Sequence, residues 1–467
     1  MRHARPVVLG AVLCAVTAWN AAARQPSPYR ALAREILAEL VAIDTSAEGV
    51  GTTPAADVIV RRLQKAGYPA SDIKLVGPQP ANRNLLVRLR GSGGARPLLL
   101  LAHMDVVPAH RDDWSLDPFT LTEQDGWFYG RGTRDNKAGV ATLVTNLIRW
   151  KQEGLAPGRD IIVLLTALEE QGGADGIPWV LANHPELRES EFCLNTDSGK
   201  GVLRDGRPAV MSLQAAEKTF QSFRLESTSA GGHSSVPQAD NAIYRLAAAL
   251  TRLAAHRFPV RLTEVTRAYF ERTAALEGGP NARDMAAVAR VPFDPAAADR
   301  LSATPSLNAA LRTTCVATQV NAGHAENALP QRATAIVNCR ILPGEDPADV
   351  QATLVSVLGD PEIAVAPVKP AESSEASTLS PAVVGVVERL ARERWNVPVV
   401  PVMEVGATDG LHVRNAGVLT YGLSALFDPP GENRAHGRDE RVHVETFYGA
   451  VEFWDAMVRT LAAGAGR

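Results

Sequence analysis

Cysteine is scarce in this sequence, and its spacing argues against one kind of metal site. Four cysteines occur among 467 residues and none belongs to a Cys-x-x-Cys pair, so no zinc site built from thiolates is expected. Cys315 and Cys339 lie on two strand-like runs that are candidates for neighbouring strands, and an exported protein would be able to join them as a disulfide. The favoured interpretation is that these two residues and Cys193 are buried free thiols.

An excess of charge of either sign is also lacking. The formal net charge is −3, with 21% charged and 46% hydrophobic residues, which is typical of a soluble globular protein. Nothing in this balance indicates nucleic acid or an anionic membrane as a partner. Beyond the first two dozen residues no segment is long and apolar enough to cross a bilayer. At 467 residues the chain exceeds what one hydrophobic core usually supports, so two domains are expected.

The N-terminus has the pattern of a secretory signal peptide. Arg2, His3 and Arg5 form a basic segment, residues 7–19 are mostly apolar, and small residues follow at 21–23. This pattern predicts cleavage after about Ala23 and export, to the periplasm or the medium. The alternative, a membrane anchor, is disfavoured because the apolar run is short for a bilayer span.

Two stretches of the mature chain alternate helices and strands. This order predicts an α/β sandwich with a mostly parallel sheet, formed by residues 24–211 and 343–467. The expected helices and strands include helices at 29–43, 55–66, 138–152, 381–395 and 446–461, and strands at 84–90, 97–102 and 159–167. Residues 365–379 are rich in Pro, Ser, Glu and Ala, and are expected to form a surface loop.

The pattern changes between residues 212 and 342. Residues 220–226 alternate like a half-exposed antiparallel strand, and a helix is expected at 239–255. A variable stretch then runs through residue 300, before two more strand-like runs at 311–320 and 333–342. We therefore expect an α+β domain inserted in the larger one.

Oxygen and imidazole ligands occur in five short segments, two of which follow strongly apolar runs. Carboxylates at the ends of buried strands must be neutralised or given a cation. Two imidazoles and several carboxylates suit a pair of zinc ions that share a carboxylate. The candidates are His103 with Asp105, Asp135, Glu169 with Glu170, Asp197 and His436.

The first three segments carry the clearest signals. His103 and Asp105 are spaced to point to one side of a strand, so that Asp105 would accept the second ring N–H of His103. Asp135 precedes a helix and could serve as its N-cap, but the glycines before it favour a carboxylate that bridges two cations. Of the adjacent Glu169 and Glu170, one would bind a cation and the other would accept a proton, the alternative being an exposed acidic turn.

The other two segments are ambiguous when taken alone. Asp197 follows an expected strand and is either a terminal metal ligand or a turn former. His436 is either a ligand or a histidine of a surface loop. Their weight comes from the assembly of all five segments.

Together the five segments resemble the co-catalytic dinuclear zinc amidohydrolases. This family includes glutamate carboxypeptidase, aminoacylase, Gly-Xaa carboxypeptidase, carnosinase-type dipeptidases and succinyl-diaminopimelate desuccinylase. The likeness covers nearly the whole mature chain, with the segments in the family's order and approximate spacing. Aspartate at position 197, where the desuccinylase and glutamate carboxypeptidase branches often have glutamate, looks more like the aminoacylases, dipeptidases and Gly-Xaa carboxypeptidases.

The resemblance implies a role for each candidate. One zinc would be held by His103 and Asp197, the other by Glu170 and His436, and Asp135 would bridge them, with cobalt or manganese suiting the same ligands. Glu169 would be the general base and Asp105 the partner of His103. A cis peptide is expected after the bridging aspartate, at Asp135–Asn136.

The inserted domain would correspond to the family's lid and dimerisation domain. His233, in a Gly-Gly-His-Ser-Ser segment, would help to stabilise the tetrahedral oxyanion, in the family often across a dimer interface. Asn327 and Arg340 match positions that bind the substrate backbone and its carboxylate, for which a planar guanidinium is well suited. Gly406 and Thr408 lie in a segment that looks like a second substrate-contact loop.

The resemblance predicts an exported zinc metallopeptidase of the carboxypeptidase or dipeptidase type. Its substrates would be small peptides with a free C-terminal carboxylate, attacked by a zinc-activated water with Glu169 as general base. The alternative in the same chemistry is an N-acyl-amino-acid deacylase. A non-catalytic binding protein and a mononuclear metal hydrolase remain open, and metal content together with activity would separate them.

Overall fold

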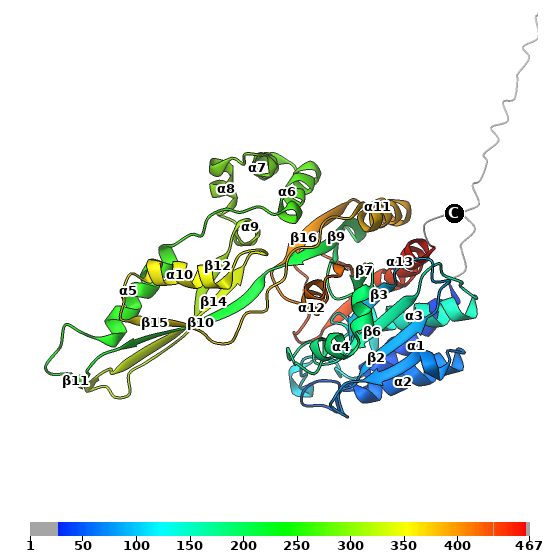
Figure 1. Cartoon of the computed structure of the whole chain (residues 1–467), viewed down its shortest axis with the longest axis horizontal. Coiled ribbons are helices and arrows are strands. Elements are labelled where there is room, and N and C mark those ends of the chain that lie inside the picture. Colours follow the sequence, from blue (N-terminus) through cyan, green and yellow to red (C-terminus); the bar gives the residue numbers. More distant parts are fainter. Residues whose placement is uncertain (1–26, 433, 464–467) are drawn as a thin grey trace, which may run out of the picture.

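The computed structural model describes residues 27–432 and 434–463, which form a large and a small unit joined side by side (Figure 1). The predicted signal peptide at residues 1–23 lies outside the described residues. None of the helices in the described part of the chain has the length and apolar character needed to cross a membrane.

The large unit is built on a 10-stranded, mainly parallel sheet with the order β1-β2-β6-β3-β7-β17-β9-β8-β18, and β16 pairs with β9. Its central strands β3, β6, β7 and β17 are mutually parallel. The strands are β1 Ile73–Val76, β2 Asn84–Leu89, β3 Leu98–His103, β6 Ile161–Thr166, β7 Phe192–Asn195, β8 Gly201–Arg204, β9 Arg207–Glu217, β16 Val399–Glu404, β17 Leu419–Gly422 and β18 Phe427–Asp428.

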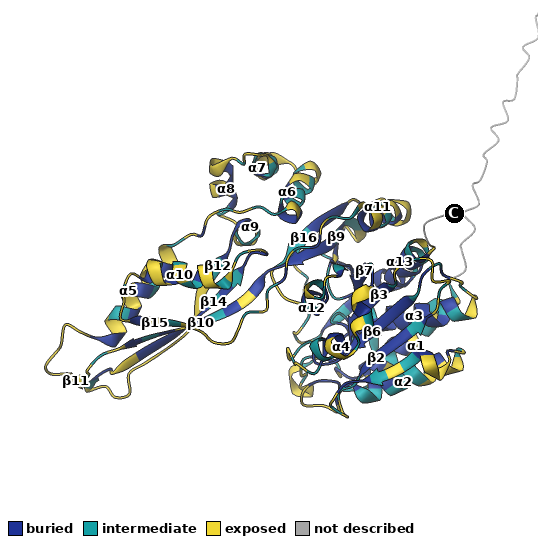
Figure 2. Cartoon of the chain, viewed as in Figure 1, coloured by how far each residue is buried: buried dark blue, intermediate teal, exposed yellow. Residues whose placement is uncertain are grey.

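Helices cover both faces of this sheet, which confirms the predicted α/β sandwich. Leu98 and Leu100 of β3 pack toward one helical layer, whereas Leu99 and Leu101 pack toward the other, because successive side chains of a strand alternate. All of β3 and β6 is therefore buried, as the dark strands in Figure 2 show. The first layer contains α1 Pro28–Val41, α2 Thr53–Lys65, α3 Lys137–Gln152, α11 Pro381–Trp395 and α13 Val444–Ala462, and the second contains α4 Ile177–Asn183 and α12 Gly410–Asn415.

A small sheet, β19-β5-β4, lies beside the large one. It consists of β4 Thr122–Gln124, β5 Trp127–Tyr129 and β19 Arg441–His443. Arg441 donates to Glu432 and stacks over Trp127. Because Glu432 and Arg441 stand on either side of His436 in the sequence, these contacts hold the segment that contains His436 against β5.

The small unit is a four-stranded antiparallel sheet with the order β12-β14-β10-β15. Two helices share its core. The sheet and this core continue past residue 342, the predicted end of the inserted segment, because the second helix and β15 follow it. The elements are β10 Thr219–Thr228, α5 Ala242–Ala255, β12 Thr314–Ala322, β14 Arg332–Ile341, α10 Pro347–Leu358 and β15 Ile363–Pro367, with the short pair β11 Gly232–His233 and β13 Ala328–Leu329 at its far tip.

The segment expected to be a variable stretch is a cluster of four helices. They are α6 Glu264–Leu276, α7 Gly279–Ala289, α8 Pro295–Leu301 and α9 Pro305–Leu311, and they enclose a hydrophobic core of their own. The side chains of Thr263 and Asp294 accept backbone N–H groups in the first turns of α6 and α8, so these residues act as N-caps, a position that Thr and Asp favour. Residues 365–379 likewise differ from the expected surface loop, because the segment begins in β15, and Ser374 and Ser377 are buried.

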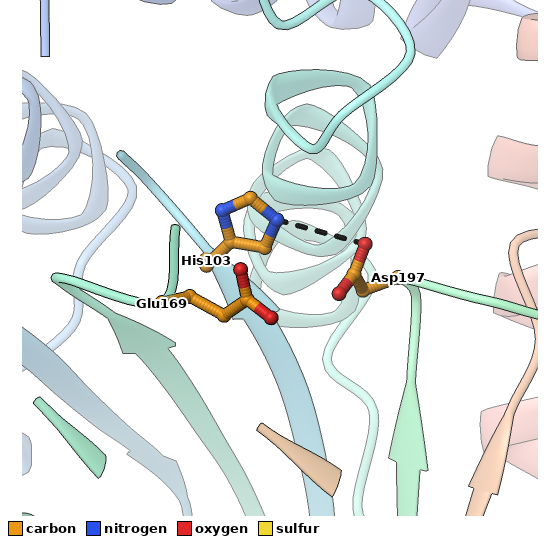
Figure 3. A group of neighbouring side chains, drawn as sticks. All are labelled: His103, Glu169 and Asp197. Carbon is orange, nitrogen blue, oxygen red and sulfur yellow. Dashed lines mark ion pairs between the residues drawn. The ribbon is translucent and has the colours of Figure 1, made fainter. Parts of the chain in front are cut away.

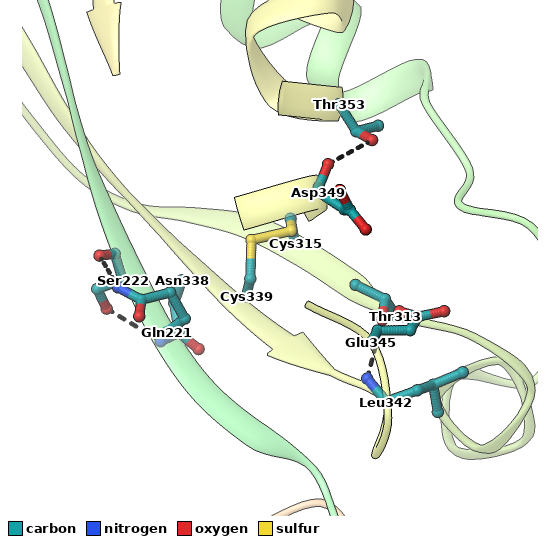
Figure 4. Close-up of a disulfide and its surroundings, with 10 residues drawn as sticks. All are labelled: Gln221, Ser222, Thr313, Cys315, Asn338, Cys339, Leu342, Glu345, Asp349 and Thr353. Carbon is teal, nitrogen blue, oxygen red and sulfur yellow. Dashed lines mark hydrogen bonds between the residues drawn. A yellow bond between two sulfur atoms is a disulfide. The ribbon is translucent and has the colours of Figure 1, made fainter. Parts of the chain in front are cut away.

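The favoured interpretation of Cys315 and Cys339 as free thiols is wrong. The two residues are directly opposite each other on β12 and β14 and form a disulfide (Figure 4). The sequence left this pairing open because it depends on the register of two strands, which has no local signature. Cys193 is a buried free thiol, as expected.

We predict that the Cys315→Ser/Cys339→Ser variant loosens the edge of the small sheet. The disulfide closes a loop with a sequence separation of 24, so its loss should lower the free energy of opening β12 by about 3 kcal/mol. Hydrogen exchange of peptides from β12 and β14 measures this change. A reductant should reproduce the effect in the native chain and add nothing in the variant, whereas two free thiols in the oxidised native protein would contradict the assignment.

Candidate metal centre

His103 occupies the carboxyl end of β3, with 2% of its surface exposed. Its Nδ1–H donates to the backbone carbonyl of Asp105 at 3.0 Å, which leaves Nε2 as the ring atom that faces the cluster. The Asp105 carboxylate, the predicted partner, is 3.7 Å from Nδ1 and instead accepts the backbone N–H groups of Glu169 and Glu170 at 3.2 and 3.0 Å. Asp105 therefore connects the end of β3 with the acidic pair after β6.

Asp135 lies between the two imidazoles. Its Oδ1 is 2.9 Å from Nε2 of His103, and its Oδ2 is 3.2 Å from Nε2 of His436. Burial would raise the pKa of Asp135, but its hydrogen bonds to the two histidines outweigh burial and hold the pKa below its usual value. The carboxylate therefore stays ionised and presents one oxygen to each side.

Glu170 and Asp197 lie at opposite ends of this arrangement. Glu170 is 3.1 Å from Nε2 of His436, and Asp197 is 3.6 Å from Nε2 of His103. Burial, and then the charge of Asp135, raise the pKa of Asp197 to about 6. Hydrogen bonds from the ring nitrogen Nε2 of His436 to the carboxylates of Asp135 and Glu170 raise the pKa of His436 to about 10.

The donor set fits a pair of divalent cations. Two overlapping groups, which share His103, each have their ligand atoms within 4.8 Å of one another: His103, Glu169 and Asp197 (Figure 3), and His103, Asp135 and Glu170. Ligand atoms at about 2.1 Å from a tetrahedral zinc lie about 3.4 Å apart, and the imidazole–carboxylate separations in the cluster, 2.9 to 3.6 Å, are close to that value. The imidazoles and carboxylates are also donors that zinc, manganese and cobalt accept.

The loop that presents Asp135 is held by a buried carboxylate that the sequence interpretation missed. Glu440 is fully buried and accepts the backbone N–H groups of Gly132, Arg134 and Asp135, at 3.1, 2.7 and 3.0 Å. It also pairs with the buried guanidinium of Arg131 at 2.6 Å, and Arg131 in turn donates to the backbone carbonyl of His436. The expected cis peptide is present at Asp135–Asn136. The loops of Asp135 and His436 are therefore fixed to one another by the Arg131–Glu440 pair.

The Glu169 carboxylate faces the same cluster, beside His103 and Asp197. Burial raises the pKa of Glu169 well above its usual value, the positive charge of His103 opposes this, and nearby carboxylates add to the rise. An acid of this kind, beside ligands that fit a metal, is suited to accept and return a proton.

Two pockets meet at this cluster and form one cleft. One has a volume of about 340 Å³ and the other about 410 Å³. Their shared walls are Glu169, Glu170, Gly406, Ala407, Thr408 and His436. The predicted substrate-contact residues Gly406 and Thr408 therefore lie directly beside the candidate metal ligands.

Arg340 lines the larger pocket only. It comes from β14 of the small unit, stacks over Phe220 at 4.6 Å and donates to the backbone carbonyl of Val405 at 2.9 Å. The cleft is thus walled by both units, and a guanidinium is part of the wall of its larger pocket.

His233 and Asn327 are not brought to the cleft of their own chain. Both lie at the far tip of the small unit, where the N–H of Ser234 donates to the carbonyl of Asn327, and neither lines either pocket (Figure 1). His233 is exposed and its Nδ1 accepts from Ser235.

The substrate-contact loop is held by a second buried network that the sequence interpretation missed. Glu217, fully buried at the end of β9, accepts the backbone N–H and hydroxyl of Thr408 at 3.0 and 3.3 Å and pairs with the guanidinium of Arg414. Burial raises the pKa of Glu217 to about 7, although Arg414 opposes the rise. Glu217 is the last residue of β9, directly before the small unit, and no local sequence signal marks it as buried.

Comparison with known proteins matches this chain to one family model and to several relatives. The model of the family described as Peptidase family M20/M25/M40 matches residues 99–460. "Probable carboxypeptidase S-like 2" of Dictyostelium discoideum is 29% identical over 397 residues, 81% of this chain and 74% of the relative. The human "N-fatty-acyl-amino acid synthase/hydrolase PM20D1" is 28% identical over 382 residues, 79% of this chain and 75% of the relative.

Solved structures share the fold. A metallo-carboxypeptidase from Sulfolobus solfataricus matches with a TM-score of 0.68 and 19% identity, over 92% of this chain and 99% of that one. Human carnosine dipeptidase 1 matches with a TM-score of 0.62 and 17% identity, over 93% and 97% of the two chains.

We predict that Glu440→Gln weakens metal binding about 10- to 100-fold without touching a ligand, because residues behind metal ligands contribute on this scale. The measurement is metal content after dialysis against a zinc buffer, with circular dichroism to establish that the variant is folded. Glu445→Gln, which removes a carboxylate that is 64% exposed, is the matched control and should retain the native metal content. Glu440→Asp, which keeps the charge but shortens its reach, should fall between the two, and full retention by Glu440→Gln would refute the role of this residue.

Proposed function

We propose a reaction for this chain from one premise: it belongs to peptidase family M20/M25/M40. The proposed reaction is hydrolysis of the amide bond of small peptides that carry a free C-terminal carboxylate. The observation that carries the proposal is the cleft in which Glu169 and the candidate ligands lie beside the guanidinium of Arg340.

The proposed cofactor is a pair of zinc ions, for which cobalt or manganese would be able to substitute. His103 and Asp197 would hold one ion, Glu170 and His436 the other, and Asp135 both. When bound, such ions lower the pKa of water and polarise a carbonyl. The distances from Asp135 to the two imidazoles support this division.

The chain's own residues would act in sequence around the scissile amide. Arg340 would bind the substrate carboxylate, which fixes the amide between the two pockets. Glu169 would take a proton from the attacking water and return it to the leaving amine. Gly406 and Thr408 would align the substrate backbone along the shared wall of the cleft.

The second candidate function is deacylation of N-acyl amino acids at the same site. It is supported by the relatives named N-fatty-acyl-amino acid synthase/hydrolase. Both substrate classes share an amide bond and a free carboxylate on the leaving amino acid, so both would use Arg340 and Glu169 alike.

We propose in addition that the chain works as a homodimer. His233 is remote from the cleft of its own chain, so a role in stabilising the oxyanion requires a second subunit, as does a role of Asn327 in substrate binding. The edge strand β12 offers a surface for such an interface, because Val316 and Val320 are 61% and 57% exposed.

The proposed location is outside the cytoplasm, in the periplasm or the medium. The pattern of residues 1–23 supports export. The Cys315–Cys339 disulfide is also of a kind that persists in oxidising compartments.

The first test is cleavage of a mixed panel of dipeptides, longer peptides and N-acyl amino acids by the purified chain, followed by mass spectrometry. We expect cleavage that a chelator abolishes and zinc restores, because water activation requires the ions. The favoured substrates distinguish peptidase from deacylase. Zinc-loaded protein that cleaves none of these substrates would overturn the proposed function.

A separate prediction concerns Glu169 as the proton acceptor. Glu169→Gln should retain native metal content but lose about 10²- to 10⁴-fold in kcat, since an amide cannot accept the proton. Metal analysis and turnover of the best substrate check the two halves of this prediction. Turnover comparable to that of the native chain would remove Glu169 from the mechanism.

A further inference from the structure

The two pockets of the cleft differ in which charged residues line one pocket and not the other. Arg340 lines the larger pocket and is absent from the walls of the smaller one, whereas Glu404 lines the smaller pocket and is absent from the larger. The reacting centre, marked by Glu169, is common to both. A substrate whose carboxylate binds Arg340 and whose amide lies at Glu169 would be able to extend its other side into the pocket of Glu404.

Glu404 is a carboxylate with little to neutralise it. It is the last residue of β16 and half-buried, and its backbone carbonyl accepts the N–H of Lys218 at 2.9 Å, which fixes its position. The side chain accepts one hydrogen bond, from the hydroxyl of Ser198 at 3.3 Å. Within residues 27–432 and 434–463 no Lys, Arg or His forms an ion pair with it.

Two cations, Arg134 and Lys200, line the smaller pocket together with Glu404, but neither forms an ion pair with it. Arg134 donates to Asp428 at 2.9 Å, so its charge already has a partner. Lys200 is exposed at the rim. The Glu404 carboxylate accepts the hydroxyl of Ser198, the residue next to the candidate ligand Asp197, so it lies close to the reacting centre.

The walls of the smaller pocket are poorly suited to an aliphatic chain. Apart from the charged residues and His436, they consist of Ser198, Gly199, Gly406, Ala407, Thr408 and Ala435. The large apolar side chains of the cleft, such as Leu168, Phe220 and Leu411, line the other pocket. The volume of about 340 Å³ is also near the lower end of ligand sites, which favours a small group.

We propose that Glu404 binds the α-ammonium group of the substrate's N-terminal residue, which makes the chain a dipeptidase that prefers unblocked amino termini. This inference rests on the proposed function and specifies its substrate class. A zwitterionic dipeptide would place its carboxylate at Arg340, its amide at Glu169 and its ammonium at Glu404. A hydrogen-bonded ion pair of this kind strengthens binding about 10- to 100-fold.

The test compares substrates that differ in one group. Alanyl-phenylalanine and N-propionyl-phenylalanine have the same carbon skeleton, but only the first carries an ammonium group. N-succinyl-phenylalanine tests the alternative of an acidic acyl group bound by Lys200, and N-dodecanoyl-phenylalanine tests a fatty acyl group. The zinc-loaded native chain should show a kcat/KM for alanyl-phenylalanine at least about tenfold above the other three.

Glu404→Gln should lower kcat/KM for alanyl-phenylalanine about 10- to 100-fold and leave N-propionyl-phenylalanine nearly unchanged. Glu404→Asp keeps the charge and should restore part of the preference. Glu393→Gln removes a carboxylate that is 58% exposed on α11 and is the matched control, with the native substrate ratio expected.

The possible results distinguish a failure of the role proposed for Glu404 from a failure of the proposed amide hydrolysis. An equal loss for both substrates in Glu404→Gln, or a native preference for any acylated substrate, would overturn the role of Glu404 and leave amide hydrolysis standing. Cleavage of none of the four substrates would count against the proposed function itself. If Glu404→Gln does not fold, the ratio of kcat/KM between alanyl-phenylalanine and N-propionyl-phenylalanine in the native chain decides whether a free ammonium group is preferred.

Discussion

The contact of the Asp135 carboxylate with two imidazoles is the interaction on which the rest of the centre depends. His103 and His436 come from distant parts of the chain, and each meets a different oxygen of Asp135. That geometry exists only because Glu440 ties the loop of Asp135 to Arg131, which also reaches the backbone of His436. The large sheet positions the other imidazole, because β3 ends at His103.

The cleft is a joint product of two units with separate cores. The large unit contributes Glu169 and the candidate ligands, and the small unit contributes Arg340 and Phe220. The chain passes between the units at Lys218, whose buried ammonium donates to the carbonyl of Arg312 at 2.6 Å. Binding of a substrate that touches both walls therefore depends on how firmly this junction sets the angle between them.

Much of the large unit could be predicted from the sequence because its central strands are short, continuous apolar runs bounded by polar residues. β3 and β6 are fully buried, and each leads to residues of the candidate centre. The five ligand segments could be grouped because the fold brings the carboxyl ends of parallel strands to one edge. Local patterns were sufficient for the strands, whereas Asp197 and His436 were ambiguous alone and were assigned through the assembly of the five segments and its resemblance to a family.

The remainder depends on contacts between distant residues. The register that pairs Cys315 with Cys339 and the burial of Glu440 have no local signature. Helices α6 to α9 were missed: α8 and α9, of 7 residues each, are too short to show a clear apolar period, and all four are stabilised by their shared core. The partner of His103 Nδ1 is a backbone carbonyl, which a pattern of side chains cannot reveal.

The position of His233 at the tip of the small unit has a genetic consequence. We consider the case in which the proposed dimer supplies this histidine to the partner's cleft. A dimer of two subunits that lack Glu169 is then inactive, and so is a dimer of two subunits that lack His233. A mixed dimer of the two would contain one cleft with both residues intact. Random pairing would then restore about a quarter of the native activity, so that two dead alleles in one cell would complement each other.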